Sequence, residues 1–585
     1  GVLNKLRSLT PAQRARGVIG ASAGNHAQAL AYCSALEGVD CLVVSKRSVR
    51  DAHTVLAAGG VNAAFGTMDP EDSWQQHAAD TLREGYLLAD PRVVEKVCRD
   101  APGALEELVE WGARLARGPD GRLTQRYFGA HRYRRTCFAG DYTGREIQRV
   151  LVDQAISKGV AYREDIRITD LLVDAGRCFG AYGFDTESGE RHVFLADAVI
   201  IATGGHTRLW RRSSSRRDEN TGDGMALALR ASCRLADMEL VQFHPTGITW
   251  PEDVAGTLVT EAVRGEGGVL TNSQGERFMS RYDPDRMELS TRDRVALANY
   301  TEISEGRGTA NGGVLLDVSQ LGLDRIRERL PRTLRQMLDL QMVDISRGPV
   351  DVAPTAHYSM GGIVVDAATH QTDVGGLYAA GEVTTGLHGA NRLGGNSLTE
   401  VLVYGRIAGT AAAAYSASLT TALRAPDAVE AAARRLDRVE AQRGEVFARP
   451  LQREIRDALW EGCGVVRDAD GLNDALLRIG GVEARLPRLD VRADLAGYAD
   501  LALACDLHDM TLCARATVLG ALERRETRGC HNRADYPEAD GPANIECLLE
   551  EGELHLSRRR PLQDATFAVP GVEAGNYAVA GRLLE

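Results

Sequence analysis

Short apolar runs alternate with longer helix-forming stretches through about the first 230 residues, and this alternation constrains the fold more than any other feature. Val18–Ala21 precedes a turn containing glycine and serine and a helix expected to end near Leu36, and Cys41–Val44 forms a second predicted strand. A later run, Ala198–Gly205, is typical of a buried strand that leads into a glycine turn. Repeated strand–helix–strand units indicate a parallel sheet with helices on its faces. We therefore predict an α/β fold with a nucleotide-binding sheet.

The middle of the chain has a different composition and hydrophobic pattern. Block 236–350 is mixed and rich in Arg, Glu and Asp, and sheet-type runs return at 362–365 and 376–380. Because the sheet pattern resumes after the interruption, the block is predicted to be inserted into a discontinuous first domain. The predicted parts of that first domain are residues 1–235 and 351–425.

The last part of the chain is predicted to be helical. Residues 426–540 are charged, with helix-type periodicity in 428–442, 451–460 and 508–525. Such amphipathic stretches favour a helical bundle. Residues 541–585 are expected to form a C-terminal tail with a strand near 566–570.

Composition and charge exclude several classes of protein. The 585-residue chain has a formal net charge of −12, whereas binding to a nucleic-acid backbone needs a concentrated basic surface. Its eleven cysteines include no C-x-x-C pair, so the usual signature of a zinc or iron-sulfur site is missing. We predict a cytoplasmic protein with reduced thiols, no metal site and no nucleic-acid partner.

No stretch of the sequence predicts a membrane span. The uncharged run 407–423 consists mostly of Ala, Gly, Ser and Thr and is too weakly apolar for hydrocarbon, so a buried helix is expected there. The chain begins at Gly1 without an apolar signal segment and is expected to be trimmed. Any attachment to the cytoplasmic face of a membrane is expected to come through another subunit.

The loop after the first strand only partly matches a dinucleotide-binding turn. That turn needs small residues in the order G-x-G-x-x-G/A, so that backbone N–H groups and a helix N-terminus can approach a pyrophosphate. The register set by the strand, Gly20-x-Ser22-x-x-Asn25, keeps only the first glycine, and a shift by two residues gives Ser22-x-Gly24-x-x-Ala27. Both registers stay open. The predicted cofactor contacts here and after the second strand are Gly20, Ser22, Gly24, Ala27, Ser45 and Lys46.

The same loop also resembles the S-x-G-N-H loop of the pyridoxal-phosphate threonine dehydratases, through S-A-G-N-H at 22–26. This resemblance covers only about the first 40 residues. The Schiff-base lysine of that family would lie upstream of Gly1, and no glycine-rich phosphate cup of its type follows. The spacing from Ser22 to Lys46 accommodates a turn, a helix and a second strand, so a dinucleotide site is the preferred interpretation.

A histidine follows the second strand in the run R-D-A-H-T-V-L-A-A-G-G at 50–60. Its small residues and paired glycines let backbone lie against a flat ring system. Here the chain resembles the flavoprotein subunit of succinate dehydrogenase and fumarate reductase, from about residue 40 to about residue 540. The resemblance implies a Rossmann-like FAD-binding domain, an inserted capping domain and a C-terminal helical domain. It also implies FAD attached covalently to His53, beside Gly59 and Gly60.

The strings Q-F-H-P-T-G and L-V-T-E-A-V-R-G-E-G-G follow each other within residues 242–268. A dicarboxylate needs cationic and hydrogen-bonding groups at both ends, which a His, a hydroxyl and an Arg-rich turn supply. By resemblance to the family, His244 and Thr260 match the groups that hold one substrate carboxylate. Glu261 and Arg264 match a proton relay.

Arg292, in S-T-R-D-R, matches the arginine of the family that passes a proton to or from the substrate. Because the pKa of arginine exceeds ~12, such a role needs neighbours that make proton exchange easy, and Glu261 and Arg264 match those neighbours. His357, in A-H-Y-S-M-G-G-I, and Arg392, in H-G-A-N-R-L-G-G, match the groups that hold the second carboxylate. Arg392 can bind it bidentately.

The remaining glycine-rich turns resemble FAD contacts of the family. Glu382, in A-G-E, matches the acid on the FAD ribose, and Asp223, in N-T-G-D-G, matches a further FAD contact. The string N-S-L, which reaches the flavin ring in the family, corresponds here to Asn396, Ser397 and Leu398.

L-aspartate oxidase shares this fold and most of these strings, and it is the alternative interpretation. Members of that family carry a Glu where Phe128 stands, and they lack the His that matches His53. A carboxylate can meet a substrate ammonium, and a phenyl ring cannot, so both positions favour succinate and fumarate. Because the chain has no cluster motif, electrons are expected to leave through an iron-sulfur partner, and through it a membrane anchor.

Two more arginine-rich segments complete the sequence features. The string at 524–537, R-R-E-T-R-G-C-H-N-R-A-D-Y-P, resembles a family element with Thr527 in place of the usual Ser, and it is predicted to be structural and to face another subunit. The basic loop 208–217 departs from the family pattern, and it is expected to be a solvated loop.

Overall fold

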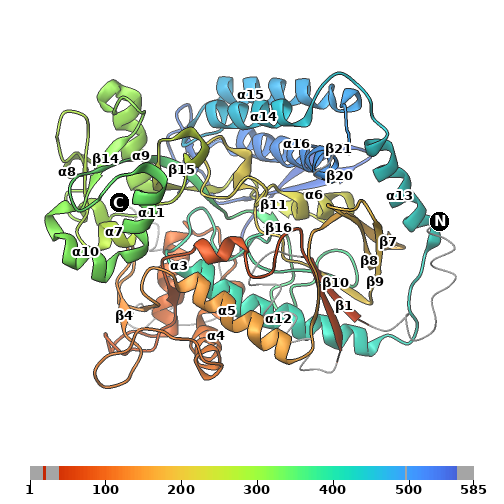
Figure 1. Ribbon diagram of the computed structural model, residues 1–585, viewed down its shortest axis with the longest axis horizontal. Coiled ribbons are helices and arrows are strands. Elements are labelled where there is room, and N and C mark those ends of the chain that lie inside the picture. Colours follow the sequence, from red (N-terminus) through yellow and green to blue (C-terminus); the bar gives the residue numbers. More distant parts are fainter. Residues whose placement is uncertain (1–16, 22–38, 494–496, 563–585) are drawn as a thin grey trace.

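A five-stranded parallel sheet organises the computed structural model, which describes residues 17–21, 39–493 and 497–562 (Figure 1). Its order is β17-β10-β1-β2-β6. The predicted apolar runs form β1 (Gly17–Ala21), β2 (Asp40–Val44) and β10 (Ala198–Ile201), which pair side by side. The edge strands are β6 (Ala161–Arg163) and β17 (Leu377–Ala379). The predicted α/β class is confirmed, and the turn and helix expected after Ala21 lie outside the described residues.

The parallel sheet is covered on both faces. Ala198 and Ile200 of β10 pack in one core cluster with residues of three helices, α4 (Pro91–Glu110), α5 (Thr143–Ser157) and α12 (Asn396–Ser418). Val199 and Ile201 pack in a second cluster with the antiparallel sheet β7 (Ile166–Asp174), β8 (Arg177–Asp185) and β9 (Arg191–Leu195). Successive residues of a strand face opposite sides, so a strand buried on both sides must be apolar throughout. This is why the strands of the sheet stand out as clear apolar runs.

Helix α12 contains the first part of the uncharged run at 407–423. Its small residues Ala408, Gly409 and Ala412 are buried, so the expected buried helix is confirmed up to Ser418, where the helix ends. Across the described parts of the chain, no helix combines the length and the apolarity that crossing a bilayer requires.

The block at 236–350 forms a layer of its own (Figure 1). Its antiparallel sheet has the order β12 (Val241–Ile248), β15 (Val350–Ser359), β14 (Val314–Asp317) and β13 (Val269–Thr271). The helices of this layer are α7 (Ala262–Gly265), α8 (Met279–Tyr282), α9 (Arg292–Glu302), α10 (Leu323–Arg329) and α11 (Pro331–Gln341). They share an apolar core with this sheet rather than with the parallel one.

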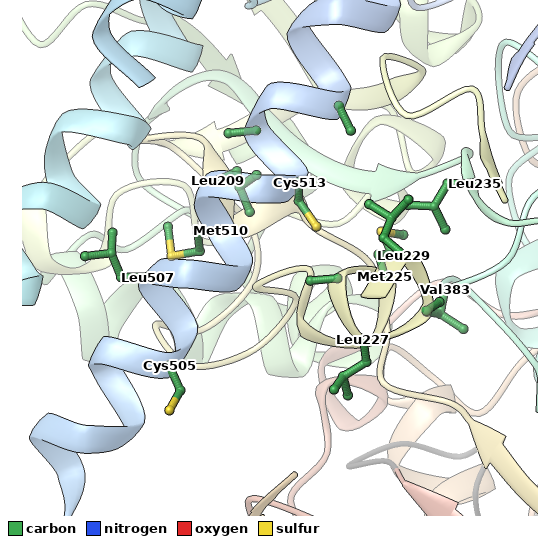
Figure 2. Packing of buried hydrophobic residues seen from close by; sticks show 14 of the residues in the cluster. Leu209, Met225, Leu227, Leu229, Leu235, Val383, Cys505, Leu507, Met510 and Cys513 are labelled. Carbon is green, nitrogen blue, oxygen red and sulfur yellow. The ribbon is translucent and has the colours of Figure 1, made fainter. Parts of the chain in front are cut away.

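Four helices form the bundle near the end of the chain: α13 (Pro426–Glu440), α14 (Ala448–Gly462), α15 (Ala469–Glu483) and α16 (Ala499–Glu523). Helix α15 was not predicted, because its three glycines weaken the helical pattern. Helix α16 begins before the residue expected, because its residues are apolar on most sides and show little periodicity. It packs against α6 (Asp223–Arg230), with Met510 and Cys513 in the shared core (Figure 2).

Three expectations about local structure were wrong. The expected tail begins with a hairpin, β20 (Asn544–Glu550) and β21 (Glu553–Arg559), and the possible strand at 566–570 lies outside the described residues. The run at 362–365 supplies β16 (Gly362–Ile363), which pairs with β11 (Leu235–Ala236) and not with the parallel sheet.

The third concerns the basic loop 208–217, which was expected to be solvated. Leu209 and Trp210 are fully buried, and the indole N–H of Trp210 donates to the carbonyl of Cys463 at 2.9 Å. Because these two apolar residues pack against the helical bundle, they hold the loop against the protein.

Candidate active site

A cavity lies between the parallel sheet and the inserted block. It begins at the carboxyl ends of two strands, at Lys46 after β2 and at Ala202–Gly204 after β10. Ligands of open parallel sheets bind at this edge. The cavity continues along 57–60 to a polar end lined by His244, Thr260, Glu261, Arg292, His357 and Arg392.

The sheet end and the middle of this cavity suit a long planar cofactor. Small residues at 57–60 form part of the wall, and a methyl group at Gly59 would lie 3.3 Å from the Phe128 ring. At Gly60 a side chain would approach the carbonyl oxygen of Cys137 to 2.6 Å, so the close approach of these two backbone segments requires glycine. Thr203 lines this part of the cavity, and its buried hydroxyl has no hydrogen-bond partner among the described residues. The residues present therefore fit FAD.

Seven of the eleven predicted cofactor residues that the structure describes line this cavity. Lys46, His53, Gly59, Gly60, Glu382, Ser397 and Leu398 all do. Asp223 is held beside it by Lys46, whose Nζ lies 3.1 Å from a carboxylate oxygen of Asp223. Burial raises the pKa of Glu382 to about 7. A carboxyl group with that pKa can donate or accept a hydrogen bond near neutral pH.

Two predicted cofactor residues point elsewhere, and three others cannot be placed. The hydroxyl of Ser45 donates to the carbonyl of Arg47 at 2.6 Å instead of facing the cavity. The side chain of Asn396 is fully buried and forms hydrogen bonds with Asn62 and His77, which join the start of α12 to neighbouring elements. Gly20 lies in β1, whereas Ser22, Gly24 and Ala27 lie outside the described residues, as does most of the segment that resembles threonine dehydratase.

His53 begins the short helix η2 (His53–Leu56), and its Nδ1 lies 3.1 Å from a carboxylate oxygen of Glu219. Burial acts to lower the pKa of His53, but the hydrogen bond and the charge of Glu219 raise it above its usual value. Since Glu219 engages Nδ1, Nε2 is the nitrogen left for another partner. The His53 side chain is 27% exposed and lines the cavity, so part of its ring is open to a ligand there.

Two neutral histidines stand on paired strands at the polar end. His244 of β12 and His357 of β15 meet edge to face, with ring centroids 5.2 Å apart. Burial and the nearby guanidinium groups hold both pKa values well below the usual range. The backbone N–H of Thr246 donates to Nδ1 of His244 at 3.2 Å, which leaves Nε2 of His244 as a donor. His357 hydrogen-bonds Ser214 at 2.9 Å.

Arg292 begins helix α9, and its Nε and Nη2 both lie 2.8 Å from one carboxylate oxygen of Glu261. Burial acts to raise the pKa of Glu261, but the charges of Arg292 and Arg264 lower it to about 2. Glu261 is therefore ionised at any working pH and can accept a proton only briefly.

Arg392 lies near Arg292, and both donate to the amide oxygen of Gln242, at 3.2 Å and 3.1 Å. Its guanidinium carbon stands 3.9 Å above the ring of Tyr358. Burial, followed by the charge of Arg292, lowers the pKa of Arg392 to about 10, so it remains a cation. Two guanidinium groups that share one neutral acceptor are poised for an anion.

Arg264 stands behind this group and does not line the cavity. Its Nη2 lies 3.9 Å from Glu261, and two of its nitrogens have no hydrogen-bond partner among the described residues. Arg264 and Arg292 thus share the carboxylate of Glu261, and Arg392 adds a third guanidinium group at this end of the cavity. Such an excess of positive charge suits a ligand with two negative charges.

Sequence reasoning missed three polar residues of the site. Gln242 stands two positions before His244 on the same strand, so it shares a face with that histidine, and strand periodicity could have identified it. Ser214 and Glu219 come from a loop whose path only the tertiary structure defines.

Comparison with known proteins agrees with this geometry. The family described as "FAD binding domain" matches residues 18–398, and "Fumarate reductase flavoprotein C-term" matches residues 452–557. The chain is 36% identical to the 8-methylmenaquinol:fumarate reductase flavoprotein subunit of Wolinella succinogenes, over 92% of this chain and 89% of that protein. It is 35% identical to the succinate dehydrogenase flavoprotein subunit of Rickettsia conorii, over 95% of this chain and 97% of that one.

Solved structures extend the likeness to three dimensions. A quinol-fumarate reductase with menaquinol molecules matches with a TM-score of 0.89 and 31% identity, over 95% of this chain and 99% of that chain. The matches span an FAD-binding domain, a capping domain and a C-terminal helical domain. These matches show that the chain belongs to the flavoprotein subunits of the succinate dehydrogenases and fumarate reductases.

Proposed function

We propose that this chain interconverts succinate and fumarate in the cavity described above, with Arg292 transferring the proton. The observation that supports it most strongly is the contact of Arg292 with Glu261, at 2.8 Å, in the middle of the polar end. Only interactions that are stronger in the transition state than in the ground state speed the reaction. A proton donor held in a fixed position speeds proton transfer more than a mobile one, because it is already oriented toward the substrate carbon.

One carboxylate of the substrate is held by Nε2 of His244 and the hydroxyl of Thr260. The other is held by the fork of Arg392, with His357 beside it. Both histidines are neutral, so they donate hydrogen bonds without adding charge to a site that already has excess cations. This arrangement fixes the substrate at both ends and excludes rotation.

Proton transfer depends on the arginines themselves. In fumarate reduction Arg292 gives a proton to the substrate carbon and is reprotonated through Glu261 and Arg264; in succinate oxidation Arg292 first passes a proton to this relay and then takes the proton from the substrate carbon. Because the pKa of arginine is very high, neutral Arg292 exists only briefly, and the ionised Glu261 holds the guanidinium group in place for the transfer. When bound, FAD supplies the N5 atom that accepts or donates the hydride.

The cofactor is held by Lys46, Asp223, Glu382 and the small residues at 57–60 and 397–398, and it is attached covalently to His53 through Nε2. Purified protein precipitated with acid should keep its yellow colour in the pellet. Flavin found only in the supernatant would contradict the covalent bond and leave FAD binding intact.

L-aspartate oxidation is the second candidate, and the position of Phe128 argues against it. Its ring is 4% exposed and lines the cavity near Arg292, where an aspartate oxidase has a carboxylate to meet the substrate ammonium. Burying an ammonium without a partner costs several kcal/mol. Dye reduction with succinate or L-aspartate at equal concentration separates the two, beside fumarate reduction by a reduced viologen. Faster oxidation of L-aspartate than of succinate would overturn the proposal.

Electrons leave or enter through an iron-sulfur partner, and through it a membrane anchor places the chain at the cytoplasmic face of a membrane. The likeness to a quinol-fumarate reductase that holds menaquinol molecules supports this route. Co-purification from cells that express the neighbouring subunits, followed by iron analysis, tests it. A chain that reduces quinone at full rate without any iron-containing partner would contradict it.

A further inference from the structure

A second cavity, of about 1360 Å³, lies where the loop 208–218 meets the inserted block and helices α14 and α16. Among the described residues, nine arginines but only five carboxylate side chains line it, so this part of its wall is strongly basic although the chain as a whole is acidic. The dicarboxylate site described above does not use these arginines.

Some of these arginines are neutralised by the protein itself. Arg167 pairs with Asp506 at 2.9 Å, Arg211 with Asp457 at 3.3 Å, and Arg216 with Asp51 at 2.7 Å. Five others have no carboxylate within 4.0 Å in the described parts of the chain: Arg208, Arg212, Arg449, Arg453 and Arg456. The cavity therefore holds a surplus of cations.

Three of the five unpaired arginines are half-buried: Arg208, Arg212 and Arg456. Their uncompensated positive charge therefore destabilises the cavity when no anion is bound. The Nε of Arg208 is sealed from solvent and has no hydrogen-bond partner among the described residues. Arg456 is fixed next to it, because its Nε donates to the backbone carbonyl of Arg208 at 3.2 Å. Burial, and then the charges of Arg208 and Arg217, lower the pKa of Arg456 to about 10. Partly buried like charges held together need a counter-ion.

We propose that this cavity binds a small phosphorylated anion with two or more negative charges, at a site that borders the first cavity at Lys46, Leu56 and Ser214 but lies apart from its dicarboxylate end. Guanidinium forks match the oxygens of phosphate bidentately. The volume exceeds that of a single inorganic phosphate, so a polyphosphate or a phosphorylated metabolite fits better. Half-buried arginines on the inner wall favour a small ligand over an acidic segment of another protein, which would meet exposed arginines first.

The loop that lines this cavity also reaches the substrate. Ser214, four residues from Trp210, hydrogen-bonds His357 at 2.9 Å, and it lines both cavities. An anion that orders this loop is therefore expected to change the KM for succinate, while an empty site leaves the reaction itself possible.

The test uses the FAD-loaded enzyme with saturating succinate, so that the cofactor and substrate sites are already filled. Isothermal titration with inorganic tripolyphosphate should show binding that persists in 0.3 M KCl. Arg456→Gln and Arg208→Gln should each weaken it at least tenfold. Arg434→Gln is the matched control, because Arg434 is an exposed arginine of α13 that pairs with Glu430 outside this cavity. It should bind tripolyphosphate like the wild type.

Further measurements separate a loss of anion binding from a loss of folding. The FAD content and thermal midpoint of each variant show whether it folds, and Arg456→Lys, which keeps the charge but loses the fork, should bind less tightly than the wild type. Titration with ATP beside tripolyphosphate shows whether a nucleoside is part of the ligand. Equal binding by all variants, loss of wild-type binding in 0.3 M KCl, or binding of polyglutamate but not of tripolyphosphate would each overturn the proposal. Succinate oxidation by the same samples tests the proposed function separately.

Discussion

The amide oxygen of Gln242 shows how single residues set the chemistry of this site. It accepts hydrogen bonds from both Arg292 and Arg392, and so holds two cations close together. On the opposite side of Arg292, Glu261 fixes the guanidinium through two of its nitrogens. The arginine is thus oriented before any substrate binds, so the reaction loses little conformational entropy in positioning this side chain.

Replacing Arg292 with Lys separates proton transfer from binding. Lysine keeps the charge but loses the planar fork that contacts Glu261 and Gln242. We expect kcat for succinate oxidation to fall by about 10²- to 10⁴-fold, the usual range for a positioned acid, while KM changes by less than about tenfold. Steady-state kinetics measure both. A kcat near that of the wild type would mean that Arg292 is only an ion-pair partner of Glu261.

Substituting Phe128 tests substrate choice. The neighbouring backbone N–H of Gly129 donates to Glu261 at 3.3 Å, so Phe128→Glu would place a new carboxylate near Glu261 and the substrate. Like charges repel, and kcat/KM for succinate should fall at least about tenfold. Phe128→Leu is the control, since it keeps an apolar wall and should lose much less. Similar losses in both variants would point to packing, not charge.

Glu219 should make stability depend on pH through His53. The pair raises the pKa of His53, so its stabilisation is fully present below the unfolded pKa of histidine, about 6.5, and is lost as pH rises through the folded pKa. Denaturant unfolding of the FAD-free protein should therefore show a larger loss from Glu219→Gln at pH 6 than at pH 9. Asp218→Asn removes a neighbouring, more exposed carboxylate that pairs with Arg47, and serves as control. A loss independent of pH would contradict the assignment.

At the scale of elements, two antiparallel strands bring the substrate groups together. His244 of β12 pairs with Thr355 of β15, and a register irregularity between Gln242 and Phe243 leaves His357 unpaired in the ladder, with its ring beside that of His244. The same layer presents Arg292 at the N-terminus of α9 and Glu261 just before α7. Because one apolar core holds β15 and both helices, their polar residues keep a fixed geometry.

The end of α16 provides the test at this scale. Arg524 is 1% exposed and pairs with Asp237 at 2.9 Å, Glu239 at 2.6 Å and Glu526 at 3.0 Å. Removing the arginine leaves buried carboxylates without their cationic partner. Arg524→Gln should therefore lower the free energy of unfolding by about 3–5 kcal/mol. Arg525→Gln, at the exposed next residue, should change it by less than about 0.5 kcal/mol. Urea unfolding measures both, and equal effects would show that the network adds nothing.

At the scale of the whole molecule, the cofactor site exists only when distant segments meet. Lys46, Glu219, Glu382 and Leu398 line one cavity but come from separate parts of the sequence. A ligand of this cavity therefore binds only the folded state and not the unfolded state, so its binding free energy adds to the stability of the fold.

FAD should stabilise the fold by a calculable amount. In the His53→Ala variant, which prevents a covalent bond, FAD at 100 times its Kd should raise the free energy of unfolding by about 2.7 kcal/mol. Denaturant unfolding with and without FAD measures this, and riboflavin, which lacks the pyrophosphate, is the control ligand. No difference between apo and FAD-containing samples would mean that the cavity does not bind FAD reversibly.

Sequence alone determined the α/β class, every strand of the parallel sheet except the edge strand β6, and the strings around His244, Glu261, Arg292 and Arg392. Those features rest on local patterns, because a strand buried on both faces must be apolar and a motif keeps its spacing along the chain. Helix α15 and the hairpin at 544–559 have weaker local patterns and were missed.

Only the tertiary structure decided which loop residues meet the site and which arginines lack partners. Glu219 reaches His53, and Ser214 reaches His357, across 166 and 143 residues of chain. The loop 208–217 looked solvated because its charges dominate its sequence, yet Leu209 and Trp210 fix it against the bundle. Burial and long-range pairing depend on the packing of separate elements, and no local pattern contains that information.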